Sequence, residues 1–202
     1  MSVSQRVTQN QYFIYLRKGK EKTDMEILEE ILNQNNLNKA YKKVVTNKGV
    51  AGVDGITVEE EFDYLKENKD RIINQIRKRK YKPQPVKRVQ IPKENGKMRN
   101  LGIPTVTDRI IQQAIFQVIS PIFEKQFNDN SFGFRPNRSC EQAVIKALEY
   151  LNDGYEWIVD IDLEKFFDTV NQDKLITIIG KTITDGDVVS LIRKYLSAGV
   201  ME

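Results

Sequence analysis

The segment from Trp157 to Asp168 constrains the fold most, because it places two aspartates inside a run of apolar residues. Residues 157–163 read Trp-Ile-Val-Asp-Ile-Asp-Leu, a pattern typical of a buried strand. Side chains alternate between the faces of a strand, so Asp160 and Asp162 would share one face. Neighbouring carboxylates repel each other and are costly to bury unless a cation or hydrogen-bond donors satisfy them. A divalent metal is the simplest remedy; helix capping by one aspartate and a surface lysine beside the other is the alternative.

The composition limits the chemistry that the chain can perform. Its 202 residues, 40% hydrophobic and 30% charged, are typical of a globular protein with one substantial domain or two small ones. There is no histidine, which excludes Ser-His and Cys-His catalysis and histidine-ligated zinc. Cys140 is the single cysteine, and no run resembles a signal peptide or a membrane span. We therefore expect a cytoplasmic protein without a membrane partner.

Positive charge is concentrated in one part of the chain. Residues 71–100 contain eleven Lys/Arg and one acid, Glu94, which gives this stretch a net charge of +10. Because the whole chain carries +4, the remainder must sum to −6. A basic zone on an otherwise acidic protein is typical of a polyanion-binding surface, although a solvated helix face would look similar.

Local patterns predict a mixture of helices and a small sheet. Two strands, 86–91 and 98–103, flank Asn95-Gly96, which is a strong hairpin signal. A long core helix begins with Thr107 as its cap and continues past Pro121. Capping residues and i, i+3/i+4 spacing predict further helices at about 23–32, 38–46, 139–154, 171–180 and 186–197. A capping box at 57–60 opens another helix, and a further helical pattern at Ile72, Ile73 and Ile76 ends in the basic residues 77–82.

The basic residues suggest two binding roles. Lys93 and Arg99 lie six residues apart across the hairpin turn, where they could hold one triphosphate, or simply solvate an edge hairpin. Others suit a nucleic-acid backbone, although Arg135 and Arg138 fit helix capping and packing nearly as well. The predicted RNA-binding residues are Arg77, Lys78, Arg79, Lys80, Lys82, Lys87, Arg88, Arg135 and Arg138.

Six ordered blocks of this sequence resemble group II intron-encoded reverse transcriptases (maturases). They are 47–55 with Gly-Val-Asp-Gly, 81–83, 91–109 with Ile-Pro-Lys and Leu-Gly-Ile-Pro-Thr, 133–139 with Gly-Phe-Arg-Pro, 159–170, and 198–202 with Ala-Gly-Val-Met-Glu. The resemblance runs from about residue 36 to the end. It implies an α+β fold: helix-rich fingers with a small antiparallel sheet, followed by the first strand and helices of a right-hand polymerase palm. The implied division is an N-terminal extension at 1–35, fingers at 36–155 and the beginning of the palm at 156–202.

The resemblance also assigns roles to residues. Asp162 matches the family's first catalytic, metal-binding aspartate, and the carbonyl of Leu163 would be a further metal ligand. Phe167 would lie under the sugar of the incoming nucleotide, while Lys93 and Arg99 match the residues that grip its triphosphate. Asp160 matches an acid that is not the principal ligand.

The sequence departs from the family's pattern in two places. Gln172 stands where the family usually has histidine. The family's later Tyr-Ala-Asp-Asp turn, which supplies the other metal carboxylates, does not occur in these residues. We therefore expect this stretch to be inactive by itself.

The function implied is that of an RNA-directed DNA polymerase of a group II intron. It would add dNTPs to a DNA primer on an RNA template with Mg²⁺, and bind intron RNA to assist splicing; whether it forms a homodimer stays open. An RNA-binding maturase module without catalysis is the alternative. A phosphatase of the haloacid dehalogenase type also has a D-x-D after a strand, but Glu164 stands where that motif requires Thr or Val.

Overall fold

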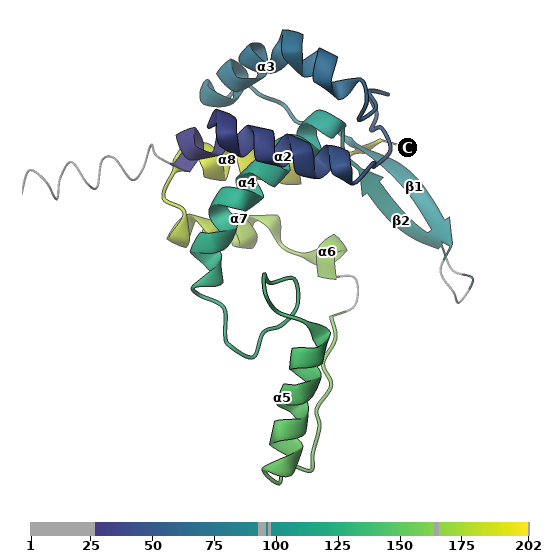
Figure 1. The fold of residues 1–202 in the computed structure, drawn as a ribbon, viewed down its shortest axis with the longest axis vertical. Coiled ribbons are helices and arrows are strands. Elements are labelled where there is room, and N and C mark those ends of the chain that lie inside the picture. Colours follow the sequence, from purple (N-terminus) through teal and green to yellow (C-terminus); the bar gives the residue numbers. More distant parts are fainter. Residues whose placement is uncertain (1–26, 93–95, 97, 164–165, 202) are drawn as a thin grey trace, which may run out of the picture. The chain divides into compact units, whose positions relative to one another are not determined.

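The computed structural model describes residues 27–92, 96, 98–163 and 166–201 (Figure 1). Residues 27–31 are helical. The elements that follow are α2 (Gln34–Thr46), α3 (Glu61–Arg77), β1 (Val86–Pro92), β2 (Met98–Ile103), α4 (Val106–Glu124), α5 (Cys140–Asn152), α6 (Phe166–Thr169), α7 (Gln172–Thr182), α8 (Gly186–Leu196) and β3 (Val200–Met201). The predicted helix-rich α+β class is confirmed.

The predicted capping residues are confirmed at α5 but not at α3 or α4. The Thr57 amide donates to Glu60 Oε2 and the Glu60 amide to Thr57 Oγ1, as in the predicted capping box, but α3 begins only at Glu61, without a side-chain cap. The Ser139 side chain accepts from the Gln142 amide, and the Gln142 side chain accepts from the Ser139 amide, as a capping box requires. The predicted Thr107 cap of α4 is wrong, because Thr105 Oγ1 accepts from the Asp108 amide at 3.1 Å. Thr107 is already inside α4, and its hydroxyl donates instead to Glu61.

The sheet contains the predicted hairpin and one strand that was not predicted. β1 pairs antiparallel with β2, and β3 pairs parallel with the start of β1, giving the order β2-β1-β3. Gly96, at the predicted turn, has a φ of 77°, which favours glycine. Gly102 is required on β2, because a Cβ there would lie 2.7 Å from Val86 Cγ2.

The hydrophobic core is organised on α4. Its buried side chains recur at helical spacing, as predicted: Val106, Ile110, Ile111, Ala114, Ile115 and Val118. Buried side chains of the surrounding helices complete this core, namely Leu28, Ile31, Ala40, Val44, Ile72, Ile76, Val188 and Leu191.

Within the described ranges, no helix is long and apolar enough to cross a bilayer.

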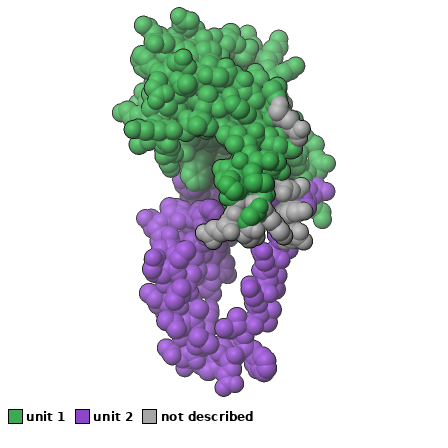
Figure 2. Space-filling model, turned by 90° about the vertical axis from the view of Figure 1, so that its right-hand side faces the viewer, with its two compact units in different colours: residues 1–119, 172–202 green, residues 120–171 purple. Residues whose placement is uncertain are grey.

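The chain divides into two compact units (Figure 2). Unit 1 combines the described residues up to 119 with 172–201, and unit 2 comprises 120–171. Long-range bonds join the two parts of unit 1: the Leu28 amide donates to Asp185 Oδ2 at 2.9 Å, and the Val86 amide donates to the Gly199 carbonyl at 3.1 Å. The boundaries of these two units do not test the predicted division into extension, fingers and palm, which stays a prediction.

Unit 2 corrects one expectation. Residues 157–163 form neither strand nor helix, and the side chains are exposed, with Trp157 93% and Ile161 82% accessible. Strands exist by pairing, and no strand of the described residues pairs with this segment. The apolar side chains of α5 are also unburied, including Val144 and Leu148. The predicted buried strand is therefore not formed here, although its apolar pattern is present.

Candidate nucleotide and nucleic-acid interface

The pairing of β1 with β2 shows on which face of the hairpin each basic residue lies. Arg99 pairs directly with Ile91 and Lys87 with Ile103, so Arg99 and Lys87 share one face. Arg88, opposite Gly102, lies on the other face. Arg88 therefore does not converge with Lys87 and Arg99. Lys87 and Arg99 are four residues apart along the strand direction, roughly 13 Å, so they would contact different phosphate groups.

Lys93, the predicted partner of Arg99, lies outside the described residues. Arg99 itself is exposed on β2. A guanidinium on a paired strand is held by the backbone ladder while its fork stays accessible, which suits bidentate contact with a phosphate.

A buried carboxylate at the start of α4 fixes the chain that leads into β1. Asp108 Oδ1 accepts from the hydroxyls of Tyr81 at 2.7 Å and Tyr195 at 3.1 Å. Asp108 Oδ2 accepts from the Gln84 amide at 3.0 Å and from Thr105 Oγ1 at 2.9 Å. Burial, together with the nearby Asp108 charge, raises the pKa of both tyrosines, so both remain donors. Asp108 thus ties the entry of the hairpin to α4 and α8.

The Gly-Val-Asp-Gly loop packs against the same end of α4. A Cβ on Gly52 would lie 2.6 Å from the Thr105 backbone, so only glycine allows this approach. Arg109 Nη2 donates to the Val50 carbonyl at 2.7 Å. Beneath the loop, Glu61 is fully buried, accepts from Thr107 at 2.7 Å, and has its pKa raised by burial to about 7. These contacts give the loop a packing role.

The basic end of α3 contains two kinds of side chain. Arg77 forms a salt bridge with Glu29 at 2.7 Å, and Arg79 forms one with Asp187. Lys194 Nζ donates to the Tyr81 carbonyl at 3.0 Å and to the Arg79 carbonyl. By contrast, Lys78, Lys80 and Lys82 are exposed and make no salt bridge within the part of the chain that is described. The lysines, rather than the arginines, are available to a polyanion.

Two predicted RNA-binding residues are engaged in contacts within unit 2. The Arg135 side chain is 6% exposed; it binds Glu124 Oε1 at 2.7 Å and the carbonyls of Asn128 and Ser131 at 2.7 and 2.8 Å. Arg138 lies over the Phe132 ring at 5.6 Å. Arg135 therefore holds its own loop together and is not available to bind RNA.

The aspartate segment is accessible. Asp160, Asp162 and Leu163 are exposed, and Phe167 is 86% exposed, with its ring 5.7 Å from that of Phe166. The Asp162 carboxylate and the Leu163 carbonyl are hard oxygen donors, which suit Mg²⁺. No cluster of three or more His, Cys, Asp or Glu that could bind a metal occurs in the described ranges. These residues fit part of a magnesium site.

Residues 91–202, more than half of the chain, match the reverse transcriptase (RNA-dependent DNA polymerase) family. The chain belongs to this family. The predicted resemblance is thereby confirmed, and the phosphatase alternative is excluded.

Curated relatives of this chain include intron-encoded proteins. The group II intron-encoded protein LtrA of Lactococcus lactis subsp. cremoris is 40% identical over 164 residues, covering 81% of this chain and 27% of LtrA. Protein YkfC of Escherichia coli is 41% identical over 123 residues, covering 59% of this chain and 32% of YkfC. Nuclear intron maturase 1 of Arabidopsis thaliana is 30% identical over 104 residues, 50% of this chain and 14% of that protein. This chain thus spans less than a third of the length of each of these relatives.

A solved structure supports the fold of this chain. A chain of a partial Cas6-RT-Cas1–Cas2 complex superimposes with a TM-score of 0.53 over 83% of this chain and 27% of the other, at 21% sequence identity. At that identity the likeness concerns the fold alone.

One departure from the family pattern has a local explanation. Gln172, at the start of α7, donates through Nε2 to the Leu196 carbonyl at the end of α8, at 2.9 Å. The side chain therefore connects two helices of unit 1, which gives the amide a structural role at this position.

Sequence reasoning missed the two buried carboxylates that position the hairpin and the loop. Asp108 had a recognisable signal, because Thr105 lies three residues before it at a helix start. Glu61 had none, since its burial depends on Thr107, 46 residues away.

Proposed function

We propose that the full-length protein is a group II intron-encoded RNA-directed DNA polymerase that also binds its intron RNA. The family match over residues 91–202, with 40% identity to a group II intron-encoded protein over 81% of this chain, is the observation that carries this proposal. The substrates would be an RNA template, a DNA primer and dNTPs. By binding the intron RNA, the protein would also assist splicing.

In the proposed mechanism, each described residue has a limited task. Asp162 and the Leu163 carbonyl would hold a divalent ion together with carboxylates from elsewhere in the protein; such an ion activates the attacking oxygen and stabilises the leaving one. Arg99, with Lys93, would bind the triphosphate and orient it. Phe167 would contact the sugar, where an aromatic ring leaves no room for a 2′-hydroxyl.

The hairpin register supplies a matched test of nucleotide binding. In the full-length protein, Arg99→Ala should raise the KM for dNTP in primer extension about tenfold or more, because it removes charge-assisted bonds worth about 1.5–3 kcal/mol. Arg88→Ala, on the opposite face, should change that KM less than about twofold. RNA affinity should stay near normal in Arg99→Ala. Loss of RNA binding in Arg99→Ala would remove the triphosphate role.

A non-catalytic RNA-binding role is the second candidate, favoured by the exposed lysines that follow α3 and make no salt bridge to any described residue. Replacing Lys78, Lys80 and Lys82 together with glutamine should weaken intron RNA binding. The slope of log K against log salt should become shallower by about 0.7–0.9 for each phosphate that the variant no longer neutralises.

The control replaces three scattered exposed lysines, Lys42, Lys125 and Lys181, by glutamine. This control variant loses the same three positive charges, but from lysines that are far apart in the sequence. An equal decrease in slope in both triple variants would indicate non-specific attraction. A normal polymerase rate in a protein with weakened RNA binding would separate the two functions.

A further inference from the structure

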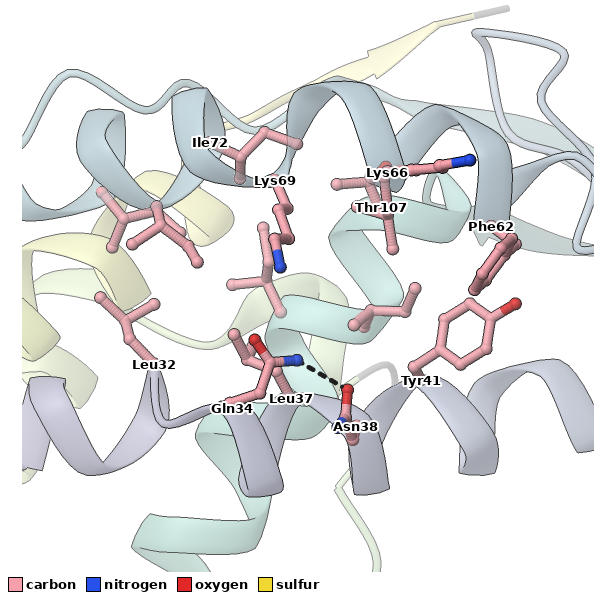
Figure 3. Close-up of a pocket in the computed structure, with 15 residues that line it drawn as sticks. Leu32, Gln34, Leu37, Asn38, Tyr41, Phe62, Lys66, Lys69, Ile72 and Thr107 are labelled. Atoms are coloured by element: carbon pink, nitrogen blue, oxygen red, sulfur yellow. Dashed lines mark hydrogen bonds between the residues drawn. The ribbon is translucent and has the colours of Figure 1, made fainter.

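A pocket in unit 1 has no part in the function proposed above. Its volume is about 310 Å³, and it lies between α2, α3 and α4 (Figure 3). None of the residues assigned to metal, nucleotide or RNA binding lines it. This volume is within the range of small-molecule sites, which begins at roughly 300 Å³.

The walls of the pocket are apolar and its charged groups are all positive. Leu37 of α2, Leu65 and Ile73 of α3, and Ile111 of α4 contribute to the walls. The charged lining residues are Lys66 and Lys69, and among the residues described no Asp or Glu lines the space. A ligand that complements this lining is therefore mainly apolar and carries negative charge.

Lys69 is placed to bind the charge of such a ligand. Its side chain extends from α3 towards α2, with the ammonium nitrogen between the two helices, whereas Lys66 lies beside α3 (Figure 3). Neither lysine makes a hydrogen bond or salt bridge to any described residue. Lys69 is exposed, so its ammonium can be reached by an anion from solvent, and the ion pair adds a modest gain to the apolar contacts of the ligand body.

Two polar side chains at the pocket wall bond to each other: Gln34 Nε2 donates to Asn38 Oδ1 at 2.8 Å (Figure 3). Thr107 is not available as a donor, since its hydroxyl proton is used by Glu61. We therefore assign the anionic group of the ligand to Lys69.

Two other occupants fit less well. The apolar residues 12–16 of this chain are followed by Arg17, Lys18 and Lys20, which would repel Lys66 and Lys69. A nucleic-acid backbone carries a charge on every residue and would gain nothing from the leucine and isoleucine walls.

We propose that this pocket binds a small amphiphilic anion, with an aromatic or aliphatic body between α2, α3 and α4 and a carboxylate or sulfonate on Lys69. The proposal is independent of the polymerase function. It predicts that an aromatic sulfonate binds this protein at one site.

The probe for the test is 8-anilinonaphthalene-1-sulfonate, titrated into the full chain by fluorescence and calorimetry. We expect one-to-one binding whose Kd rises about three- to tenfold in Lys69→Gln. Lys42→Gln, an exposed lysine of α2 that does not line the pocket, should leave the Kd unchanged. The uncharged analogue N-phenyl-1-naphthylamine should bind both lysine variants equally. An equal weakening for the uncharged probe in Lys69→Gln would overturn the charge pairing.

Exposed apolar residues of unit 2 are a competing site for this probe, so location must be measured. In methyl NMR spectra of the unmodified chain, the probe should shift Leu65, Ile73 and Ile111. Shifts confined to Ile158 and Ile161, or loss of binding in Trp157→Ala, would overturn the proposal. Tighter probe binding after deletion of residues 1–20 would assign the pocket to that segment instead.

Discussion

Asp162→Asn in the full-length protein should lower the rate of primer extension at least about a hundredfold. The amide removes one negative charge from the metal ligands. A bound metal ion stabilises the charge of a transition state by several kcal/mol, and each 1.4 kcal/mol corresponds to a tenfold change in rate. The measurement is single-turnover extension of a DNA primer on an RNA template. Intron RNA affinity, measured in parallel, should stay normal.

Asp160→Asn is the matched control for this experiment. The two aspartates are both exposed, two residues apart in the same segment, and differ only in their proposed roles. We expect a loss of no more than about tenfold in Asp160→Asn. If that variant loses as much activity as Asp162→Asn, or more, the assignment of the principal ligand is wrong.

The largest effect on stability is expected at Asp108. Asp108→Ala should lower the free energy of unfolding by roughly 3–5 kcal/mol, because it leaves two tyrosine hydroxyls and the Gln84 amide without an acceptor in a buried site. Asp108→Asn keeps one acceptor oxygen and should cost about 2 kcal/mol. Urea unfolding measures both values.

Asp70→Ala provides the comparison for Asp108, since Asp70 is an exposed aspartate on α3 in the same unit. It should change stability by less than about 0.5 kcal/mol. A double-mutant cycle with Tyr81→Phe should give a coupling energy of about 1–2 kcal/mol. No coupling, or equal losses at residues 70 and 108, would show that the carboxylate does not organise this site.

The sequence predicted those parts of the fold whose cause is local. The hairpin follows from Asn95-Gly96 between two β-rich runs, and α4 follows from its apolar spacing, so both were found. β3 was missed, because two residues carry no pattern and the partner strand begins 114 residues earlier, at Val86. The strand at 157–163 was predicted from its β-branched residues alone, and strands also require a partner.

In the candidate site too, roles carried by short motifs were predicted, whereas contacts with distant residues were not. The family resemblance assigned Asp162 and Arg99 from short motifs, and both are accessible on the surface as those roles require. Arg135 was assigned to RNA, with packing as the alternative, and the structure shows packing: the side chain contacts Glu124 and two carbonyls. Charge alone cannot distinguish a binding arginine from one that holds a loop.

The joining of unit 1 from two distant parts of the chain has a consequence for its biosynthesis. The ribosome delivers β1 and the Leu28 amide early, but Asp185, Lys194 and β3 only after all of unit 2. At about 5–20 residues per second, the 52 residues of unit 2 impose a delay of roughly 3–10 s. During that time one edge of β1 has unpaired backbone groups, which another chain could pair with. The exposed lysine and arginine on this strand therefore also oppose aggregation until β3 pairs with β1.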